Sequence, residues 1–245
     1  MKYNIITSFN EKYWQEVTKE NIELLDEFLT EQSRLFLYHQ LQEVPKNFKS
    51  RVEWLDLYST CPELPEFVEA WKDHPKANGS VQGFRSNAVK FVHKTFPIWH
   101  RAKLLDEGWL IWLDADVIPL REIDINFFSS VCPDDKMISF MGRPGKYSEC
   151  GFIGFNVSHT DTLDFIKEWE ELYVSGKFIE LKETHDSWTF DWLRKQKDSD
   201  RFFNVNADAK TNKNPFSQSL LKNYFAHAKG DKKQKQSQRL KSRLS

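Results

Sequence analysis

Two carboxylates directly follow a run of five apolar residues, Trp109 to Leu113, with Gly108 before the run and Pro119 beyond it. A run of this kind predicts a buried central strand. Side chains two apart on a strand point to the same side, so Asp114 and Asp116 are expected to converge at the carboxyl end of the strand. Open α/β sheets bind their ligands at that edge. A hard divalent cation, Mg²⁺ or Mn²⁺, is the natural counter-charge for two converging carboxylates.

A second group of candidate residues lies near the C-terminus, in the stretch from His227 to Lys233. The imidazole of His227 can complete an oxygen-rich metal site, and Gly230 allows the backbone to approach a phosphate closely. Lys232 or Lys233 would then supply a point charge to that phosphate. Taken alone, the stretch is better explained as a solvated basic segment leading into the tail, with a histidine that has no role in metal binding.

Two further groups of candidate residues lie in short segments in the second half of the chain. From Glu149 to Asn156, glycines flank an apolar strand, so the backbone is either crowded by a ligand or turns sharply; a loop followed by an edge strand fits equally well. In Thr184-His185-Asp186-Ser187-Trp188, the polar side chains at a helix start could bind an acceptor hydroxyl. A helix N-cap followed by a core tryptophan is the structural alternative.

The expected helix from Phe84 to about His100 carries four basic side chains, Arg85, Lys90, His93 and Lys94. Arg85 lies near its N-terminus, where anions bind well. The lysines of such a helix can equally form a solvated face, and for Lys94 this is the favoured interpretation.

Composition restricts the class of protein. The chain has 245 residues, of which 40% are hydrophobic and 29% charged, as in a globular protein with a substantial core. No stretch approaches the roughly 20 apolar residues of a transmembrane helix. The N-terminus enters a strand-like run without the apolar region of a signal peptide, and the three cysteines are scattered. A cytoplasmic location is therefore expected.

Charge is unevenly distributed. Residues 229–245 contain seven basic side chains and one acid, whereas the remainder contains 28 basic and 35 acidic ones. We therefore expect one domain over residues 1–228 and a basic, flexible tail over 229–245. An acidic body argues against nucleic-acid binding. The tail is either solvated or holds the protein near a charged glycan acceptor or near anionic lipid, weakly at the inner membrane face.

Strands alternating with helices predict a mostly parallel sheet covered by helices on both faces. The prolines at 45, 62, 65 and 75 are expected in turns, Pro97 is expected to kink or end its helix, and the chain after Val205 is expected to be loop-like. The expected strands are 5–9, 35–38, 52–57, 109–113, 137–141 and 152–157, and the expected helices are 11–30, 84–100, 160–173 and 185–195.

In this order the motifs resemble one family. Leu113-Asp114-Ala115-Asp116-Val117-Ile118-Pro119-Leu120 looks like the DxD motif of GT-A (Rossmann-like) glycosyltransferases, most like glycosyltransferase family 8, the glycogenin and lipopolysaccharide galactosyltransferase group. His227, Gly230 and Lys233 match the spacing of that family's C-terminal H-x-x-G-x-x-K motif. The chain departs from the family at Glu149-Cys150-Gly151, where Asn-x-Gly is usual, at His185-Asp186-Ser187, where Asp-Gln-Asp is usual, and after Lys233, where Pro-Trp is absent.

The resemblance implies a metal-dependent hexosyltransferase that uses a nucleotide-diphosphate sugar, UDP being the favoured nucleotide, and a glycan or lipid-linked acceptor. Asp114, Asp116 and His227 would hold Mn²⁺ or Mg²⁺, with Ala115 between the two aspartates. The implied donor-binding residues are Thr7, Ser8, Arg85, Lys90, Gly230 and Lys233. Asp186, or less readily Glu149, would position or deprotonate the acceptor hydroxyl, and Lys233 would assist departure of the diphosphate. Retaining chemistry, the family's own, would need no separate base.

Two other functions remain open. A non-catalytic sugar-nucleotide or glycan-binding protein of the same fold would explain the missing Asp-Gln-Asp. A metal-dependent nucleotidyl- or phosphotransferase would need a glycine-rich loop after the first strand, where this chain has Thr7-Ser8-Phe9-Asn10.

Overall fold

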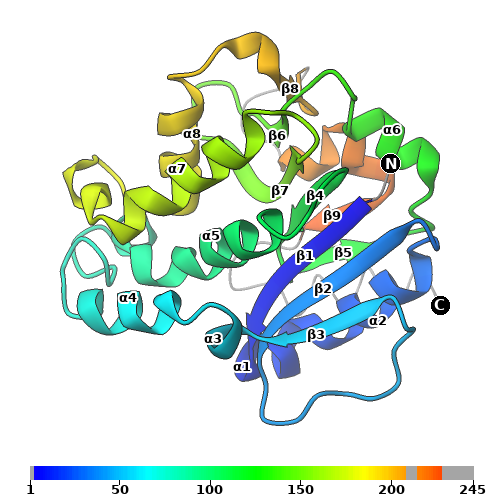
Figure 1. The fold of residues 1–245 in the computed structure, drawn as a ribbon, viewed down its shortest axis with the longest axis horizontal. Coiled ribbons are helices and arrows are strands. Elements are labelled where there is room, and N and C mark those ends of the chain that lie inside the picture. Colours follow the sequence, from blue (N-terminus) through cyan, green and yellow to red (C-terminus); the bar gives the residue numbers. More distant parts are fainter. Residues whose placement is uncertain (1–2, 208–213, 228–245) are drawn as a thin grey trace.

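A seven-stranded sheet runs through the centre of the computed structural model, which describes residues 3–207 and 214–227 (Figure 1). The strand order is β3-β2-β1-β4-β7-β6-β8. All neighbouring pairs are parallel except those that β7 makes with β4 and β6, so β7 alone runs against the others. The predicted mostly parallel sheet is therefore confirmed. The strands are β1 (Tyr3–Asn10), β2 (Ser33–Gln40), β3 (Val52–Asp56), β4 (Trp109–Leu113), β6 (Ile138–Met141), β7 (Glu149–Asn156) and β8 (Phe202–Asn204).

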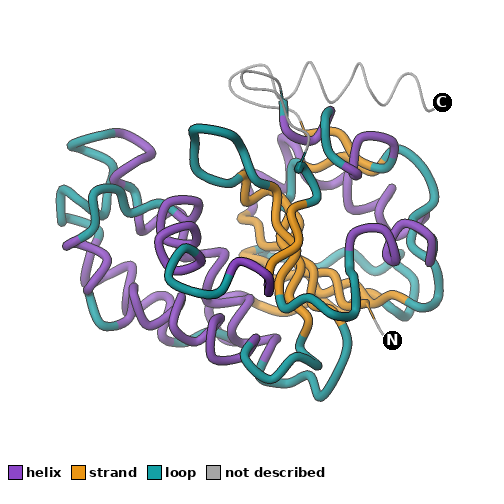
Figure 2. Tube along the Cα trace, turned by 90° about the horizontal axis from the view of Figure 1, so that it is seen from above, coloured by secondary structure: helices purple, strands orange, loops and turns teal. Residues whose placement is uncertain are grey.

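Helices cover both faces of this sheet, which Figure 2 shows between them. One face packs against α4, α5, α7 and α8, and the other against α2, α6 and a small antiparallel sheet of β5 and β9. The bounds are α1 (Glu11–Tyr13), α2 (Lys19–Phe28), α3 (Leu57–Thr60), α4 (Glu63–Trp71), α5 (Ala88–Ala102), α6 (Ile125–Val131), α7 (Thr162–Val174), α8 (Asp186–Arg194), β5 (Val117–Pro119) and β9 (Phe225–His227).

Strand β4 lies in the middle of the sheet, as its apolar run predicts. Leu110 and Trp112 pack into the core on the α5 side, while Trp109, Ile111 and Leu113 pack into the core on the opposite side. All of its residues are buried because both faces of the strand are covered. The strand therefore delivers Asp114 to a fixed point at the edge of the sheet.

Several elements differ from the expectations, among them two helices that contain or follow prolines. Pro62 and Pro65 do not mark a loop: Pro62 caps α4 and Pro65 lies in its first turn, where the missing amide hydrogen costs no helical bond. Helix α5 continues through Pro97 to Ala102, and the fully buried neighbours Phe96 and Ile98 offset the lost hydrogen bond.

The chain after Val205 is not simply loop-like. Two short 3-10 turns, Pro215–Ser217 and Leu220–Asn223, lead into β9, which pairs with β5. The boundary at residue 228, the basic tail, Gly230 and Lys233 lie outside the described residues. No helix in the described part of the chain is long and apolar enough to cross a membrane.

Candidate active site

The two aspartates lie in a turn immediately after β4 rather than on the strand itself. Strand β4 ends at Leu113, and the amide of Val117 donates to the carbonyl of Asp114 at 2.9 Å, closing the turn that leads into β5. The amide of Asp114 is held by the carbonyl of Gly151 on β7 at 3.0 Å. The carboxylates still converge, but through the turn and not through the strand pleat.

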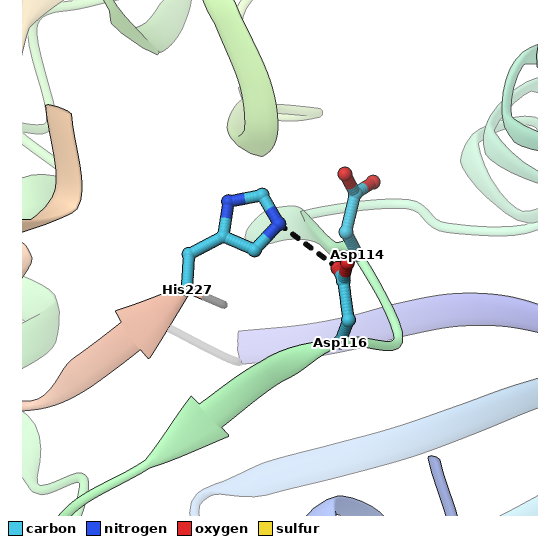
Figure 3. Close-up of side chains that lie close together, drawn as sticks. All are labelled: Asp114, Asp116 and His227. Atoms are coloured by element: carbon cyan, nitrogen blue, oxygen red, sulfur yellow. Dashed lines mark hydrogen bonds and ion pairs between the residues drawn. The ribbon is translucent and has the colours of Figure 1, made fainter. Parts of the chain in front are cut away.

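His227 reaches these carboxylates because β9 pairs with β5. The register places His227 opposite Val117, next to Asp116 in the chain. Its Nε2 lies 2.9 Å from Oδ1 of Asp116, as the dashed line in Figure 3 marks. One potential ligand atom from each of Asp114, Asp116 and His227 lies within 4.8 Å of the others. The two segments, 111 residues apart in the chain, thus form one compact cluster.

Gly151 makes room for this histidine. A Cβ atom on Gly151 would lie 3.1 Å from Cε1 of His227 and 3.1 Å from the ring of Phe216. These distances are tighter than ordinary contacts, so any larger residue would displace the imidazole or Phe216. The expected alternatives for a glycine here were crowding by a ligand and a sharp turn, but the group that crowds Gly151 is the chain's own His227.

A buried lysine connects the cluster to the start of α8. Lys94, only 6% exposed, places its Nζ 2.9 Å from Oδ1 of Asp114 and 2.5 Å from Oδ2 of Asp186. The same ammonium donates to the carbonyl of Cys150 at 2.7 Å, and the indole of Trp112 donates to Oδ1 of Asp114 at 2.7 Å. The ammonium therefore balances two carboxylates that would otherwise repel each other.

The charges of this network determine the pKa directions. Burial opposes the charged form of Asp186, but the neighbouring Lys94 ammonium outweighs it, so the pKa of Asp186 falls well below its usual value. Burial likewise opposes the Lys94 cation, yet Asp114 and Asp186 raise the pKa of Lys94. Burial and the charge of Asp116 raise the pKa of Tyr13. Lys94 and Asp186 are therefore both charged at neutral pH.

A cavity of about 490 Å³ opens over the cluster. Its lining combines Ser8 and Asn10 at the end of β1 and Tyr13 on α1 with Lys90 on α5 and the aspartates of the turn. Figure 1 shows the ends of β1 and β4 side by side, and their parallel pairing brings both carboxyl ends to this edge. The volume falls within the range of small-ligand sites.

The residues of the cluster fit a divalent cation. Two carboxylates and an imidazole are a donor set that Mn²⁺ and Mg²⁺ accept, the imidazole favouring Mn²⁺. Nδ1 of the buried His227 has no hydrogen-bond partner in the described structure. Oδ2 of Asp114 accepts no hydrogen bond from any described residue, and its side chain remains 29% exposed at the cavity.

Solved structures share this architecture, although no protein-family model and no curated protein sequence matches the chain. A galactosyltransferase, LgtC, solved with donor and acceptor sugar analogues, matches with a TM-score of 0.53 at 12% identity, over 98% of this chain and 95% of that one. Mouse xyloside xylosyltransferase 1 matches with a TM-score of 0.52 at 13% identity, over 84% of this chain and 86% of that one. A glycosyltransferase involved in glycosylation of the major capsid of PBCV-1 matches with a TM-score of 0.50 at 13% identity, over 99% of this chain and 100% of that one.

The fold is that of GT-A glycosyltransferases. Within it, Asp114, Asp116 and His227 lie close together, and Ser8 and Lys90 line the cavity beside the two aspartates. Ala115 also lines the cavity. Thr7 does not line it: the strand pleat turns its fully buried side chain to the other face of β1.

Three other candidate residues lie around the cluster. Asp186 is 4% exposed and is tied to Lys94, while Oε1 of Glu149 lies 3.9 Å from Nδ1 of His227. Arg85 lines a second, larger cavity beside α8, with its Nε 3.8 Å from Glu183. Asp186 and Glu149 therefore border the cluster, whereas Arg85 belongs to the neighbouring cavity.

Lys94 is the residue that sequence reasoning assigned wrongly, because the solvated face of α5 does not include it. A signal for its burial exists in the sequence. Lys94 follows Phe91 by three residues and precedes Ile98 by four, so helical spacing places it on the same stripe as these apolar side chains. A lysine on a buried stripe requires an anionic partner, and the two aspartates after β4 are the obvious ones.

Proposed function

We propose that the protein is a metal-dependent glycosyltransferase that moves a sugar, a hexose being favoured, from a nucleotide diphosphate to a hydroxyl of a glycan or lipid-linked acceptor. The observation that carries the proposal is the Asp114–Asp116–His227 cluster, whose two aspartates line a ligand-sized cavity in a GT-A fold. A nucleotide-sugar donor places its diphosphate at such a cluster. UDP is the nucleotide that the motif resemblance favours.

Asp114, Asp116 and His227 would hold Mn²⁺ or Mg²⁺. A cation held there would supply positive charge against the negative charge that grows on the diphosphate as the sugar leaves. Asp114 and Asp116 lie in the turn that leads into β5, and His227 lies on β9, which pairs with β5. Their positions are therefore fixed before any ligand arrives.

The donor would extend from the cluster along the end of β1. Ser8 and Asn10 present polar groups on one wall, and the aromatic rings of Tyr13 and Phe91 offer surfaces for a base. Lys90, exposed on the first turn of α5, would supply a point charge to the phosphates. Gly230 and Lys233 would complete the phosphate contacts, as the motif resemblance implies.

Asp186 would position the acceptor rather than deprotonate it. Lys94 keeps the pKa of Asp186 well below its usual value, which makes this carboxylate a weak base at neutral pH. We favour retention of configuration: the bond from the anomeric carbon to the diphosphate oxygen breaks, and the acceptor oxygen attacks from the same face. The acceptor proton passes to the departing diphosphate oxygen, so no protein base is required.

A second candidate function is binding of a sugar nucleotide without turnover. It is favoured by the same observation that weakens Asp186 as a base, since Asp186 is buried and ion-paired in the segment where related motifs have Asp-Gln-Asp. Such a protein would bind UDP with Mn²⁺ and would neither hydrolyse nor transfer any sugar.

A thermal-shift screen of nucleoside diphosphates and their sugars, each with and without Mn²⁺, tests the proposal directly. We expect a metal-dependent rise in the melting temperature for one nucleotide, because a ligand that binds only the folded state stabilises it. Asp116→Asn should abolish both the shift and sugar transfer. Asp106→Asn, which changes an exposed aspartate on the loop before β4, is the matched control and should retain both.

Transfer at the full rate by Asp116→Asn would overturn the metal-dependent mechanism. A metal-dependent shift without hydrolysis or transfer from any donor would instead establish the binding protein.

A further inference from the structure

A second cavity of about 1240 Å³ lies beside the candidate metal cluster. Its walls come from α8, from the loop between β6 and β7, from the segment before α8 and from the end of β8. In Figure 1 these elements lie together at the end of the sheet formed by β7, β6 and β8. The residues that bind the nucleotide in our proposal do not line this second cavity. Arg85, which the motif resemblance assigned to the donor, does line it.

The cavity is basic although most of the chain is acidic. Six basic side chains and two acidic ones line it, whereas residues 1–228 carry 28 basic and 35 acidic side chains. Both acids are already engaged: Asp191 accepts from Ser148 and pairs with Arg194, and Oε2 of Glu183 lies 3.0 Å from Nε2 of His185. Arg85, Arg143 and Arg194 pair with carboxylates, so the positive charge of the wall is only partly cancelled.

Three of the cations make no ion pair with any described residue: Lys146, Lys182 and Lys195. They are exposed and come from different segments of the wall, the β6–β7 loop, the segment before α8 and the residue after α8. Cations that converge on one hollow without carboxylate partners repel each other unless an anion enters. The arrangement thus indicates a ligand that carries negative charge.

Aromatic and amide groups accompany these cations. Trp188 and Trp192 lie one turn apart on α8 and both line the cavity, with Trp192 40% exposed. Asn204 and Asn206 also line the cavity, and the buried Oδ1 of Asn206 has no hydrogen-bond partner in the described structure. Indole rings pack against the apolar faces of sugars, and amides hydrogen-bond to hydroxyls, so the lining suits a glycan.

The cavity also adjoins the groups that would carry out transfer. Arg143 on its wall lies 3.6 Å from Glu149, which in turn lies 3.9 Å from His227. On the other side, the ring of Tyr147 packs at 4.6 Å on His185, the residue before Asp186. Direct side-chain contacts therefore connect the wall of this cavity to the cluster and to the start of α8.

From the charge, the aromatic lining and this adjacency, we infer that the second cavity is the acceptor subsite and that the acceptor is an anionic glycan, one that carries carboxylate or phosphate groups. This inference rests on the proposed glycosyltransferase function, because that function gives the cavity its role. The binding chemistry itself depends on the wall alone.

Isothermal titration calorimetry without nucleotide or metal tests the wall independently of catalysis. The probes are hexagalacturonate, maltohexaose carrying one phosphate, and neutral maltohexaose. We expect an anionic probe to bind about tenfold more tightly than the neutral one, with an advantage that falls as salt is added. The hexagalacturonate and phosphate arms distinguish carboxylate from phosphate recognition. Equal binding of all three probes, or no binding of any, would overturn the inference.

The double variant Lys146→Glu/Lys195→Glu should weaken the preferred anionic probe about tenfold, since it reverses two unpaired charges on the wall. Lys19→Glu/Lys222→Glu changes the same charge at two exposed lysines outside both cavities and should leave the affinity within about twofold. An equal loss in both doubles would show that only net charge matters, and the subsite would be refuted.

The two proposals fail separately. Binding of the anionic glycan with no metal-dependent nucleotide binding would overturn the glycosyltransferase function and leave the anionic site in place. Nucleotide binding and transfer to neutral acceptors, with no preference for the anionic probe, would overturn only the acceptor inference.

Discussion

The two cavities beside the sheet handle charge in opposite ways. At the candidate metal cluster, Lys94, Asp114 and Asp186 form a buried network in which each charge lies within 3 Å of an opposite one. In the larger cavity, Lys146, Lys182 and Lys195 are exposed and make no ion pair with a described residue. The first site holds its charges in fixed positions, and the second leaves them solvated.

This difference predicts different responses to substitution. Removing one member of a buried network leaves its partners as uncompensated charges, which is far more costly than the loss of one exposed charge. The cluster should therefore be sensitive to single changes, and the larger cavity should respond only gradually.

The largest effect is expected for Lys94→Met. It removes the ammonium between Asp114 and Asp186 while keeping the length of the side chain, so two carboxylates face each other in a buried site. The free energy of unfolding at neutral pH should fall by about 3 kcal/mol. Urea denaturation followed by circular dichroism measures the change.

Lys90→Met is the matched control, because Lys90 lies one turn earlier on α5 and is exposed. It should change the unfolding free energy by less than about 0.5 kcal/mol. The difference in unfolding free energy between the two variants should become smaller at low pH, because protonation of Asp186 in Lys94→Met relieves its repulsion with Asp114. Equal stability of the two variants at neutral pH would show that the buried network does not exist.

The second effect concerns the geometry of the cluster. Gly151→Ala adds a methyl group 3.1 Å from Cε1 of His227 and should push the imidazole away from Asp116. We expect the Kd for Mn²⁺, measured by titration calorimetry, to rise about tenfold while the unfolding free energy changes little.

Gly145→Ala in the β6–β7 loop provides a comparison without a steric contact, since a Cβ there meets nothing within 4 Å. Its positive φ of 68° makes that substitution slightly strained, so it tests for a general loss of stability. If Gly145→Ala raises the Kd for Mn²⁺ as much as Gly151→Ala does, the role assigned to Gly151 is wrong.

The same comparison explains which parts of the site could be predicted from the sequence. Asp114 and Asp116 stand out because carboxylates rarely follow five consecutive buried residues, and this local pattern is sufficient to locate the edge of the sheet. His227 was joined to them through the spacing of a C-terminal motif. The contact itself arises from the pairing of β5 and β9, two three-residue strands too short to show a periodicity.

The remaining features depend on tertiary packing. Helical spacing indicates that Lys94 is buried, but its pairing with Asp186 follows only from the position of α8. The basic cavity could not be predicted, because its cations come from segments between residues 85 and 195 that no local pattern connects. Helix α4 was missed because its two early prolines resemble turn signals.

A third prediction uses a carboxyl group remote from both cavities. Glu170 on α7 is half-buried beside Glu63, and burial together with that neighbour raises the pKa of Glu170 to about 7. Asp186 has the opposite shift because it has a cation beside it. A comparison of Glu170 with Asp186 therefore separates the effect of burial on a carboxyl pKa from the effect of a neighbouring cation.

The native state retains the Glu170 proton between about pH 4.5 and pH 7, where the unfolded chain has lost it. Stability must therefore fall as the pH rises through this range. Glu170→Gln should be more stable than the unmodified protein by about 1 kcal/mol at pH 8, after allowance for partial exposure, and should show no advantage at pH 4. Chemical denaturation at both pH values measures the difference, and a constant offset would contradict the raised pKa.

The smallest effect is expected in the larger cavity. Lys195→Ala removes one of several solvated cations, so the affinity for an anionic oligosaccharide should fall only about twofold. Lys146→Ala should lower the affinity by the same factor. In the double variant the two factors should multiply, because exposed charges on separate segments interact weakly. A single substitution that abolished binding would mean that one lysine makes a buried, directional contact with the ligand. The larger cavity would then resemble the metal cluster, with one fixed charge pair in place of a diffuse positive wall.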